Sequence, residues 1–91
     1  MAVVFIPSLL RDVTGGQDRL DVPGATVRQI VNNLESAYPG VRARLCDGDR
    51  LSPNVQVAVD GRVSRLGMLE KVGADSEVHF IPALSGGKEL G

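Results

Sequence analysis

GATVRQIVNNLESAYPG, residues 24–40, decides the fold, because it contains the clearest helix pattern of the chain. Thr26 and Gln29 have the spacing of a capping box, in which two side chains satisfy the free amide groups at a helix N-terminus. Pro39 and Gly40 end the helix, since proline disfavours the helical conformation at the residue before it. Apolar residues between these signals have the spacing of one helix face: Val27, Ile30, Val31, Leu34, Ala37 and Tyr38. The stretch therefore predicts one amphipathic helix in the middle of the chain.

Two strand patterns precede this helix. AVVFI at residues 2–6 is rich in β-branched residues and is stopped by Pro7. QDRLDV at 17–22 returns as a second strand after Gly15 and Gly16, which can adopt positive φ in a turn. The chain therefore begins with a strand, a loop and a strand.

Further strand patterns follow the helix. VRARLC at 41–46 predicts one more helical turn, and CDGDR at 46–50 predicts a turn. NVQVAV at 54–59 leads into Asp60–Gly61, a dipeptide typical of tight hairpins, and 62–65 can form a short return strand. EVHFIP at 77–82 is the last strand. In the connection between them we expect Leu66, Leu69 and Val72 to anchor the chain in the core.

This order of elements predicts an α+β fold in which one mixed sheet of four or five strands packs on one main helix. Alternation along the strands assigns residues to two faces. The face toward the helix has Val4, Ile6, Val55, Val57, Val59, Val78 and Phe80, and the outer face has Val3, Phe5, Ala58, His79 and Ile81. Such an outer face is either a set of ordinary surface hydrophobes or a docking surface for a partner.

Composition limits the classes of function. The 91 residues are enough for one domain, and a net charge of −1 with scattered basic residues argues against nucleic-acid binding. No apolar run approaches the roughly 20 residues of a membrane span, and the N-terminus lacks the pattern of a signal peptide. We expect no membrane association and a cytoplasmic location. The single cysteine, Cys46, excludes an internal disulfide.

Motifs for catalysis or metal binding are weak. The GGK of residues 86–88 has neither the preceding glycine nor the following hydroxyl of a phosphate-binding loop. Asp75, Glu77 and His79 alternate along one strand, but with a single histidine a solvent-facing edge is the better interpretation than a metal site. We expect no catalytic residue and no metal.

The chain ends in FIPALSGGKELG, residues 80–91, with adjacent glycines at Gly86 and Gly87. We expect a domain over residues 1–84 and a flexible tail over 85–91. Such a tail is either a frayed terminus or an arm that enters another protein. Glycine suits the second role, because it lacks a Cβ and fits a narrow channel.

Several stretches together resemble one family. VVFIPSLLRDVTGGQ, GATVRQIVNNLESAYPGVRARL, VAVDGR and VHFIPALSGG are similar to the ubiquitin-like β-grasp sulfur carriers of the ThiS and MoaD type. The resemblance covers residues 2–87, and IPSLLRDVTGG leans toward the carriers of the thiocarboxylate-dependent cysteine pathway. It implies the β-grasp fold, whose order of elements agrees with the one derived above.

The resemblance implies a carrier rather than an enzyme. An E1-like adenylyltransferase would use ATP and Mg²⁺ to adenylate the Gly87 carboxylate, and sulfur would then replace AMP to give a thiocarboxylate. The carrier itself would hold no permanent cofactor. A synthase, cysteine-synthase-like or other, would accept the sulfur. Gly86 would be the slender neighbour of Gly87, while Phe80, Ile81, Pro82 and Ser85 would set the tail exit.

The sequence departs from the family at its end, where Lys88, Glu89, Leu90 and Gly91 follow the glycine pair. Three explanations remain open. Residues 88–91 are a removable extension, cut between Gly87 and Lys88 by a JAMM-type metalloprotease; or Gly91 is itself activated; or sulfur transfer is lost and protein binding kept. The alternative function is a ubiquitin-like protein modifier or a non-catalytic protein-binding module that uses the outer face.

Overall fold

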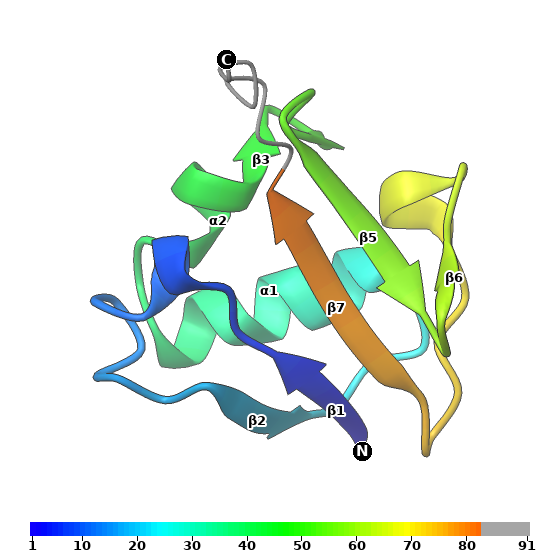
Figure 1. Cartoon of the computed structure of the whole chain (residues 1–91), viewed down its shortest axis with the longest axis horizontal. Coiled ribbons are helices and arrows are strands. Elements are labelled where there is room, and N and C mark those ends of the chain that lie inside the picture. Colours follow the sequence, from blue (N-terminus) through cyan, green and yellow to red (C-terminus); the bar gives the residue numbers. More distant parts are fainter. Residues whose placement is uncertain (83–91) are drawn as a thin grey trace, which may run out of the picture.

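The computed structural model describes residues 1–82, which form a main sheet, a two-stranded ribbon, one main helix and several short elements (Figure 1). In chain order these are β1 (Ala2–Phe5), η1 (Ser8–Leu10), β2 (Arg19–Val22), α1 (Val27–Ala37), α2 (Val41–Leu45), β3 (Cys46–Asp47), β4 (Arg50–Leu51), β5 (Val55–Val59), β6 (Arg62–Val63), η2 (Gly67–Leu69) and β7 (Glu77–Pro82). The helix α1 crosses one face of the sheet (Figure 1).

The main sheet has five strands in the order β2-β1-β7-β5-β6. The last strand, β7, lies between the first strand and β5, parallel to β1 and antiparallel to β5. The other pairs, β1 with β2 and β5 with β6, are antiparallel hairpins. The predicted mixed sheet on one helix is therefore confirmed.

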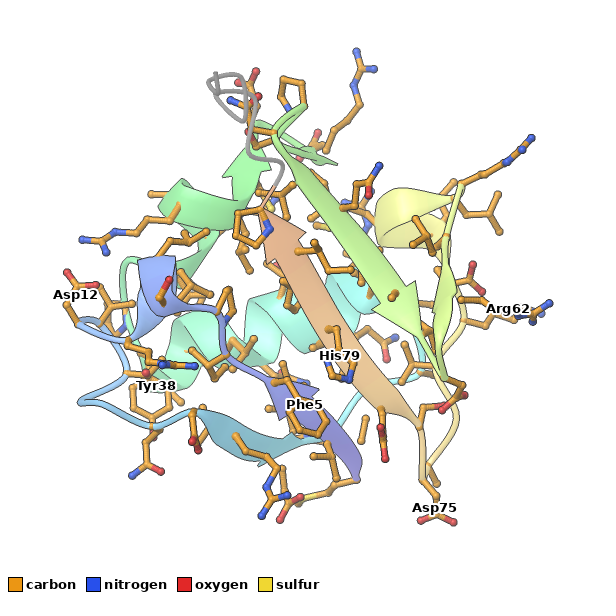
Figure 2. The ribbon with its side chains drawn as sticks, viewed as in Figure 1. Phe5, Asp12, Tyr38, Arg62, Asp75 and His79 are labelled. Atoms are coloured by element: carbon orange, nitrogen blue, oxygen red, sulfur yellow. The ribbon has the colours of Figure 1, made fainter. Side chains whose placement is uncertain are left out.

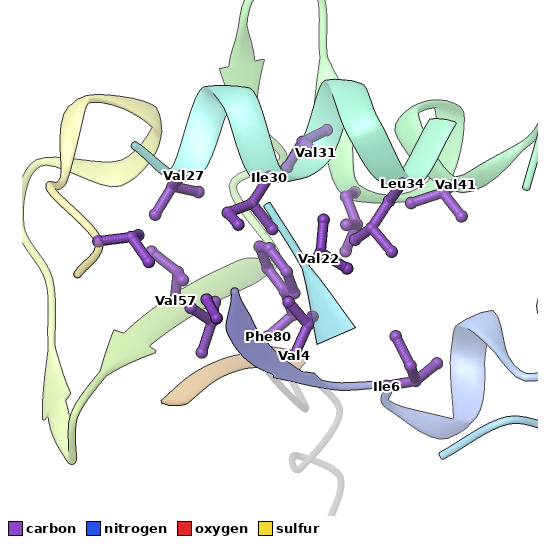
Figure 3. Close-up of a cluster of buried hydrophobic side chains, with 14 of the residues drawn as sticks. Val4, Ile6, Val22, Val27, Ile30, Val31, Leu34, Val41, Val57 and Phe80 are labelled. Carbon is purple, nitrogen blue, oxygen red and sulfur yellow. The ribbon is translucent and has the colours of Figure 1, made fainter. Parts of the chain in front are cut away.

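The helix α1 begins where the sequence predicts and packs through its apolar face. The Gln29 amide donates to Thr26 Oγ1 at 3.2 Å, while Gln29 Oε1 accepts from the Ala25 amide at 2.7 Å, so the capping box includes the residue before the cap. Figure 3 shows the side chains that the helix and the sheet bury against each other: Val4, Ile6, Val22, Val27, Ile30, Val31, Leu34, Val41, Val57 and Phe80.

The hairpin between β5 and β6 turns at Asp60–Gly61, as predicted. Both residues have positive φ, 53° and 85°, which is the requirement of a type I′ turn. The Asp60 carboxylate also accepts from the Glu77 amide at 3.0 Å and from Ser76 Oγ at 2.8 Å. These bonds lower the pKa of the Asp60 carboxyl, and they hold the turn against the start of β7.

A short helix and a two-stranded ribbon follow α1. The predicted helical turn is α2, and its first amides are bound by one side chain: Glu35 Oε1 accepts from the Gly40 amide at 3.2 Å and from the Arg42 amide at 2.8 Å. The ribbon of β3 with β4 was not predicted, although the turn between its strands was. Two residues per strand are too few to show alternation.

The connection from β6 to β7 corrects one expectation. Leu66 and Leu69 are 58% and 67% exposed and do not anchor the chain, whereas Met68 and Val72 are buried. Gly67, at φ 55°, starts the 3-10 turn η2, and residues three apart in such a turn lie on the same side. Backbone bonds fix the segment to the start of α1, since the Val27 amide donates to Glu70 O and the Val72 amide to Ala25 O, both at 2.9 Å.

Candidate functional site

The end of β7 carries the described chain to the point from which the tail continues. Phe80 is 3% exposed and fixes the strand in the core, while Ile81 is 39% exposed on the opposite face. Pro82 lies opposite Val55 at the start of β5 and has no amide hydrogen to give to the ladder. Three of the four predicted tail-exit residues thus lie at the end of β7, and their role at the tail exit stays a prediction. Ser85, Gly86, Gly87 and Lys88 lie outside the described residues.

The outer face of the sheet brings together the five residues predicted for it. Phe5 lies opposite His79 in the parallel pair of β1 and β7, and Ala58 lies opposite His79 in the antiparallel pair of β5 and β7. Directly opposite residues of neighbouring strands point to the same face. Val3 is two residues before Phe5 on β1, and Ile81 is two residues after His79 on β7, so the alternation of the strands points both to the same face. The structure therefore places all five on the face away from α1.

Phe5 and His79 form the centre of this outer face. Their rings are stacked, with centroids 4.2 Å apart and an interplanar angle of 5° (Figure 2). Both side chains are half-buried, whereas Ala58 beside them is buried and adds little exposed surface. The stack is a flat, partly apolar platform, and its rings have little freedom to lose when another surface covers it.

One residue of the outer face was missed by the sequence reasoning. Val63 on β6 lies opposite Ala58 and is exposed, so it extends the row that begins at Phe5. The signal for it was in the sequence, because counting outward from the two-residue turn Asp60–Gly61 pairs Val59 with Arg62 and Ala58 with Val63.

Charged groups border the apolar platform. Arg19 on β2 lies opposite Phe5, and Asp21 lies opposite Val3. The carboxylate of Glu77 is 3.8 Å from His79 Nε2, at one margin of the stack. An apolar centre with a polar rim is the usual arrangement of a protein-binding surface. This surface shares β7 with the tail exit.

Within residues 1–82 no group of three or more His, Cys, Asp and Glu side chains could hold a metal ion. Cys46 lies half-buried against the core, and burial raises the pKa of its thiol, so the reactive thiolate is disfavoured. In the same part of the chain no helix is long and apolar enough to cross a membrane. The outer face is thus an apolar centre with a charged rim, on the strand that ends at Pro82.

Comparison with known proteins gives consistent matches. A model described as the ThiS family matches residues 4–87. The sulfur carrier protein CysO of Mycobacterium tuberculosis is 32% identical over 89 residues, which cover 92% of this chain and 96% of that protein. A chain in the crystal structure of the Amycolatopsis orientalis BexX/CysO complex has a TM-score of 0.87 and 32% identity, covering 91% of this chain and 96% of that one. One crystal structure of small archaeal modifier protein 1 (SAMP1) of Haloferax volcanii has a TM-score of 0.71 and 30% identity, covering 93% of this chain and 97% of that one.

Proposed function

Because the chain belongs to the ThiS family and has the β-grasp fold of its relatives, we propose that it is a sulfur carrier protein whose reactive group is the carboxylate of Gly87. The observation that carries this proposal is the extent of the family match. The match runs from residue 4 to Gly87 and ends there, although four residues follow. A boundary at the second glycine supports Gly87 as the functional chain end.

The chemistry at Gly87 follows from the properties of a carboxylate. A free carboxylate is a poor electrophile, so it first attacks the α-phosphorus of ATP and releases pyrophosphate. In the resulting acyl adenylate AMP is a good leaving group, so hydrosulfide can attack the carbonyl carbon, expel AMP and leave a thiocarboxylate. An E1-like adenylyltransferase supplies the ATP and Mg²⁺, and the carrier contributes the acyl group. We therefore assign no catalytic residue and no resident cofactor to the chain itself, and we place it in the cytoplasm, where ATP is available.

The extension after Gly87 must be removed before this step. An internal peptide carbonyl has no carboxylate oxygen to attack ATP. Hydrolysis of the bond between Gly87 and Lys88 adds water, frees the Gly87 carboxylate and releases KELG as a peptide. We assign this cleavage to a JAMM-type metalloprotease, whose metal-bound water is the nucleophile.

Two partners of the mature form are implied. The activating enzyme docks on the outer face, where the Phe5–His79 platform lies on the strand that leads to the tail. The sulfur-accepting enzyme is a synthase. The name CysO of the relatives favours cysteine synthesis as the use of the sulfur. The BexX/CysO complex shows that a CysO protein of another organism assembles with the protein BexX.

The experiment is intact-mass analysis of the protein isolated from its own cells under sulfur-sufficient growth. We expect a species that ends at Gly87, together with one heavier by the difference between a sulfur and an oxygen atom. Iodoacetamide should add one more carbamidomethyl group to the second species than to the first, because both species carry the Cys46 thiol and only the second carries a thiocarboxylate. Full-length protein alone, in cells that express the activating enzyme, would contradict the proposal.

A second candidate function is conjugation to other proteins, and the similarity to SAMP1 favours it. The same Gly87 adenylate would then be attacked by a lysine amine instead of a sulfur nucleophile, forming an isopeptide bond. Digested lysates would contain lysines that carry the residues of the tail. Their absence, with the thiocarboxylate present, would leave sulfur carriage as the function.

A further inference from the structure

A groove on the helix side of the molecule has not entered the function proposed above. It lies between the start of α1, β4 and η2, the yellow turn beside β6 in Figure 1, and it encloses about 340 Å³. Met68 and Leu51 line it as buried and half-buried side chains, while Leu66 and Leu69 line it as exposed ones. We call these four residues and the space between them the leucine groove.

The exposure of Leu66 and Leu69 is unusual for this chain. Of the five large hydrophobic side chains exposed in residues 1–82, these two lie three positions apart on one short turn, and Gly67 gives that turn its left-handed start. A core-anchoring role is excluded, because Met68 and Val72 already fill the core from the same connection. Adjacent exposed leucines that line a groove are typical of a surface that another molecule covers.

The charges at the groove specify the kind of partner. Arg28, Arg50 and Arg65 line it, and within residues 1–82 none of the three guanidinium groups is in an ion pair or a side-chain hydrogen bond. The single carboxylate in the lining, that of Asp49, lies 3.6 Å from Arg42 Nη2. A locally positive rim on a chain of net charge −1 complements carboxylates on a partner.

We propose that the leucine groove binds a protein segment that presents leucine-sized apolar side chains flanked by carboxylates. The apolar side chains enter between Leu66 and Leu69 and contact Leu51 and Met68, and the carboxylates pair with the three arginines. A flat anionic membrane would touch only the two exposed leucines, so the concave shape favours a peptide segment. The groove lies in the helix layer, and the Phe5–His79 platform lies on the outer face of the sheet, so both surfaces are open at once.

The first test uses a synthetic amphipathic peptide of leucine and glutamate, and the same peptide with lysine in place of glutamate. The ¹⁵N-labelled full chain is titrated with each. We expect the acidic peptide to shift the amide signals of Leu66, Gly67 and Leu69 and to bind at least ten times more tightly than the basic peptide. Added salt should lower the affinity of the acidic peptide. Equal binding of both peptides, or shifts confined to Phe5, His79 and Ile81, would overturn the proposal.

Variants separate the groove from the rest of the surface. We expect two variants, L66S/L69S and R65E, each to lower the affinity for the acidic peptide about tenfold or more. This is the scale at which residues are counted as interface hot spots. Ile81→Ser, which changes an exposed apolar residue on the other face, is the matched control and is expected to leave the affinity unchanged. Unaltered binding by L66S/L69S, with a native spectrum, would contradict the assignment.

Other occupants give different results. The titration is repeated with the form that ends at Gly87, because Glu89 and Leu90 of the extension have the same chemistry as the peptide. If both forms bind the acidic peptide with equal affinity, the groove is open to a separate partner. If only the shortened form binds the peptide, the extension occupies the groove, and the proposal is overturned.

Two further occupants are tested without the peptide. Chemical-shift changes at the groove when the protein alone is concentrated would indicate that a second copy binds there. Cosedimentation with phosphatidylglycerol vesicles that depends on Leu66 and Leu69 would indicate a membrane, and either result would also overturn the proposal. None of these readouts depends on sulfur transfer.

Discussion

At the scale of single residues, the proposed docking surface and the end of the sheet meet in a few side chains on two faces of one strand. In β7, Phe80 points into the core, while His79 and Ile81 point to the outer face. Phe80 fixes the position of the strand, and His79 and Ile81 belong to the proposed docking surface. His79 is held by the ring of Phe5, so its position in the free protein is already defined.

We expect His79→Ala to weaken docking of the activating enzyme without unfolding the carrier. The substitution removes one ring of the stacked pair and leaves Phe5 without its neighbour. In ATP–pyrophosphate exchange with the form that ends at Gly87, the KM for the carrier should rise about tenfold, equivalent to about 1.4 kcal/mol.

The matched control for this variant is Leu69→Ser, an exposed apolar change on the helix side, which should leave the KM unchanged. The kcat of the exchange should be unchanged in both variants, because both substitutions leave the reacting acyl group of Gly87 itself unaltered. A wild-type KM for His79→Ala would show that the Phe5–His79 platform is not the docking surface.

At the scale of elements, hydrogen bonds from side chains to backbone amides hold the short connections. Thr26 and Gln29 cap α1, Glu35 binds the first amides of α2, and Asp60 ties the β5–β6 turn to β7. The sequence signals for the cap of α1 and for the Asp60 turn were local, namely a capping-box spacing and an Asp-Gly pair. The Glu35 bonds reach across the proline-glycine turn to α2, and no local pattern indicates them.

The Asp60 carboxyl predicts a dependence of stability on pH. Hydrogen bonds from the Glu77 amide and Ser76 Oγ lower its pKa in the folded state, so the carboxylate stabilises the fold above the unfolded-state pKa of about 3.9. This contribution is lost as the pH falls below that value and through the lowered folded-state pKa. Asp60→Asn, which tolerates the positive φ, should therefore lose stability at pH 7, with a difference from wild type that shrinks toward pH 2.5.

Urea unfolding at the two pH values measures this difference. Asp75→Asn is the matched control, since Asp75 is exposed and its carboxylate makes no hydrogen bond within residues 1–82. The control should have the same pH dependence as wild type. A destabilisation of Asp60→Asn that is equal at both pH values would show that the charge of Asp60 has no part in it.

At the scale of the whole molecule, one layer of core holds the helix to the sheet, and both proposed docking surfaces lie outside this core. Leu34 is 1% exposed between α1 and the sheet (Figure 3), whereas Leu69 is 67% exposed. Leu34→Ala should lower the free energy of unfolding by about 2–5 kcal/mol, because it removes buried methyl groups and leaves a cavity. Leu69→Ala should change it by no more than about 0.5 kcal/mol.

Urea unfolding at neutral pH measures both leucine variants under the same conditions. Because a domain of this size has a total stability of only about 5–15 kcal/mol, the Leu34 variant should show a clearly shifted midpoint. Equal effects of the two substitutions would contradict the division into a buried face and an exposed groove.

The sequence by itself determined the main helix, the main strands and the residues that the outer face brings together. The position and cap of α1, the turn at Asp60–Gly61, the last strand at 77–82 and the two faces of the strands follow from spacing over a few residues. The outer-face residues Val3, Phe5, Ala58, His79 and Ile81 followed from the same alternation. The docking role of that face, and the roles of residues beyond Pro82, stay predictions.

Only the tertiary structure decided what depends on contacts between distant parts of the chain. The pairing of β7 between β1 and β5 brings His79 onto Phe5, 74 positions earlier in the sequence, and no local pattern sets that register. The connection 66–76 contains four large apolar residues, and two of them occupy the core beside the start of α1. Met68 and Val72 fill that space because the backbone of residues 70–72 pairs with the start of α1, and this pairing leaves Leu66 and Leu69 at the surface.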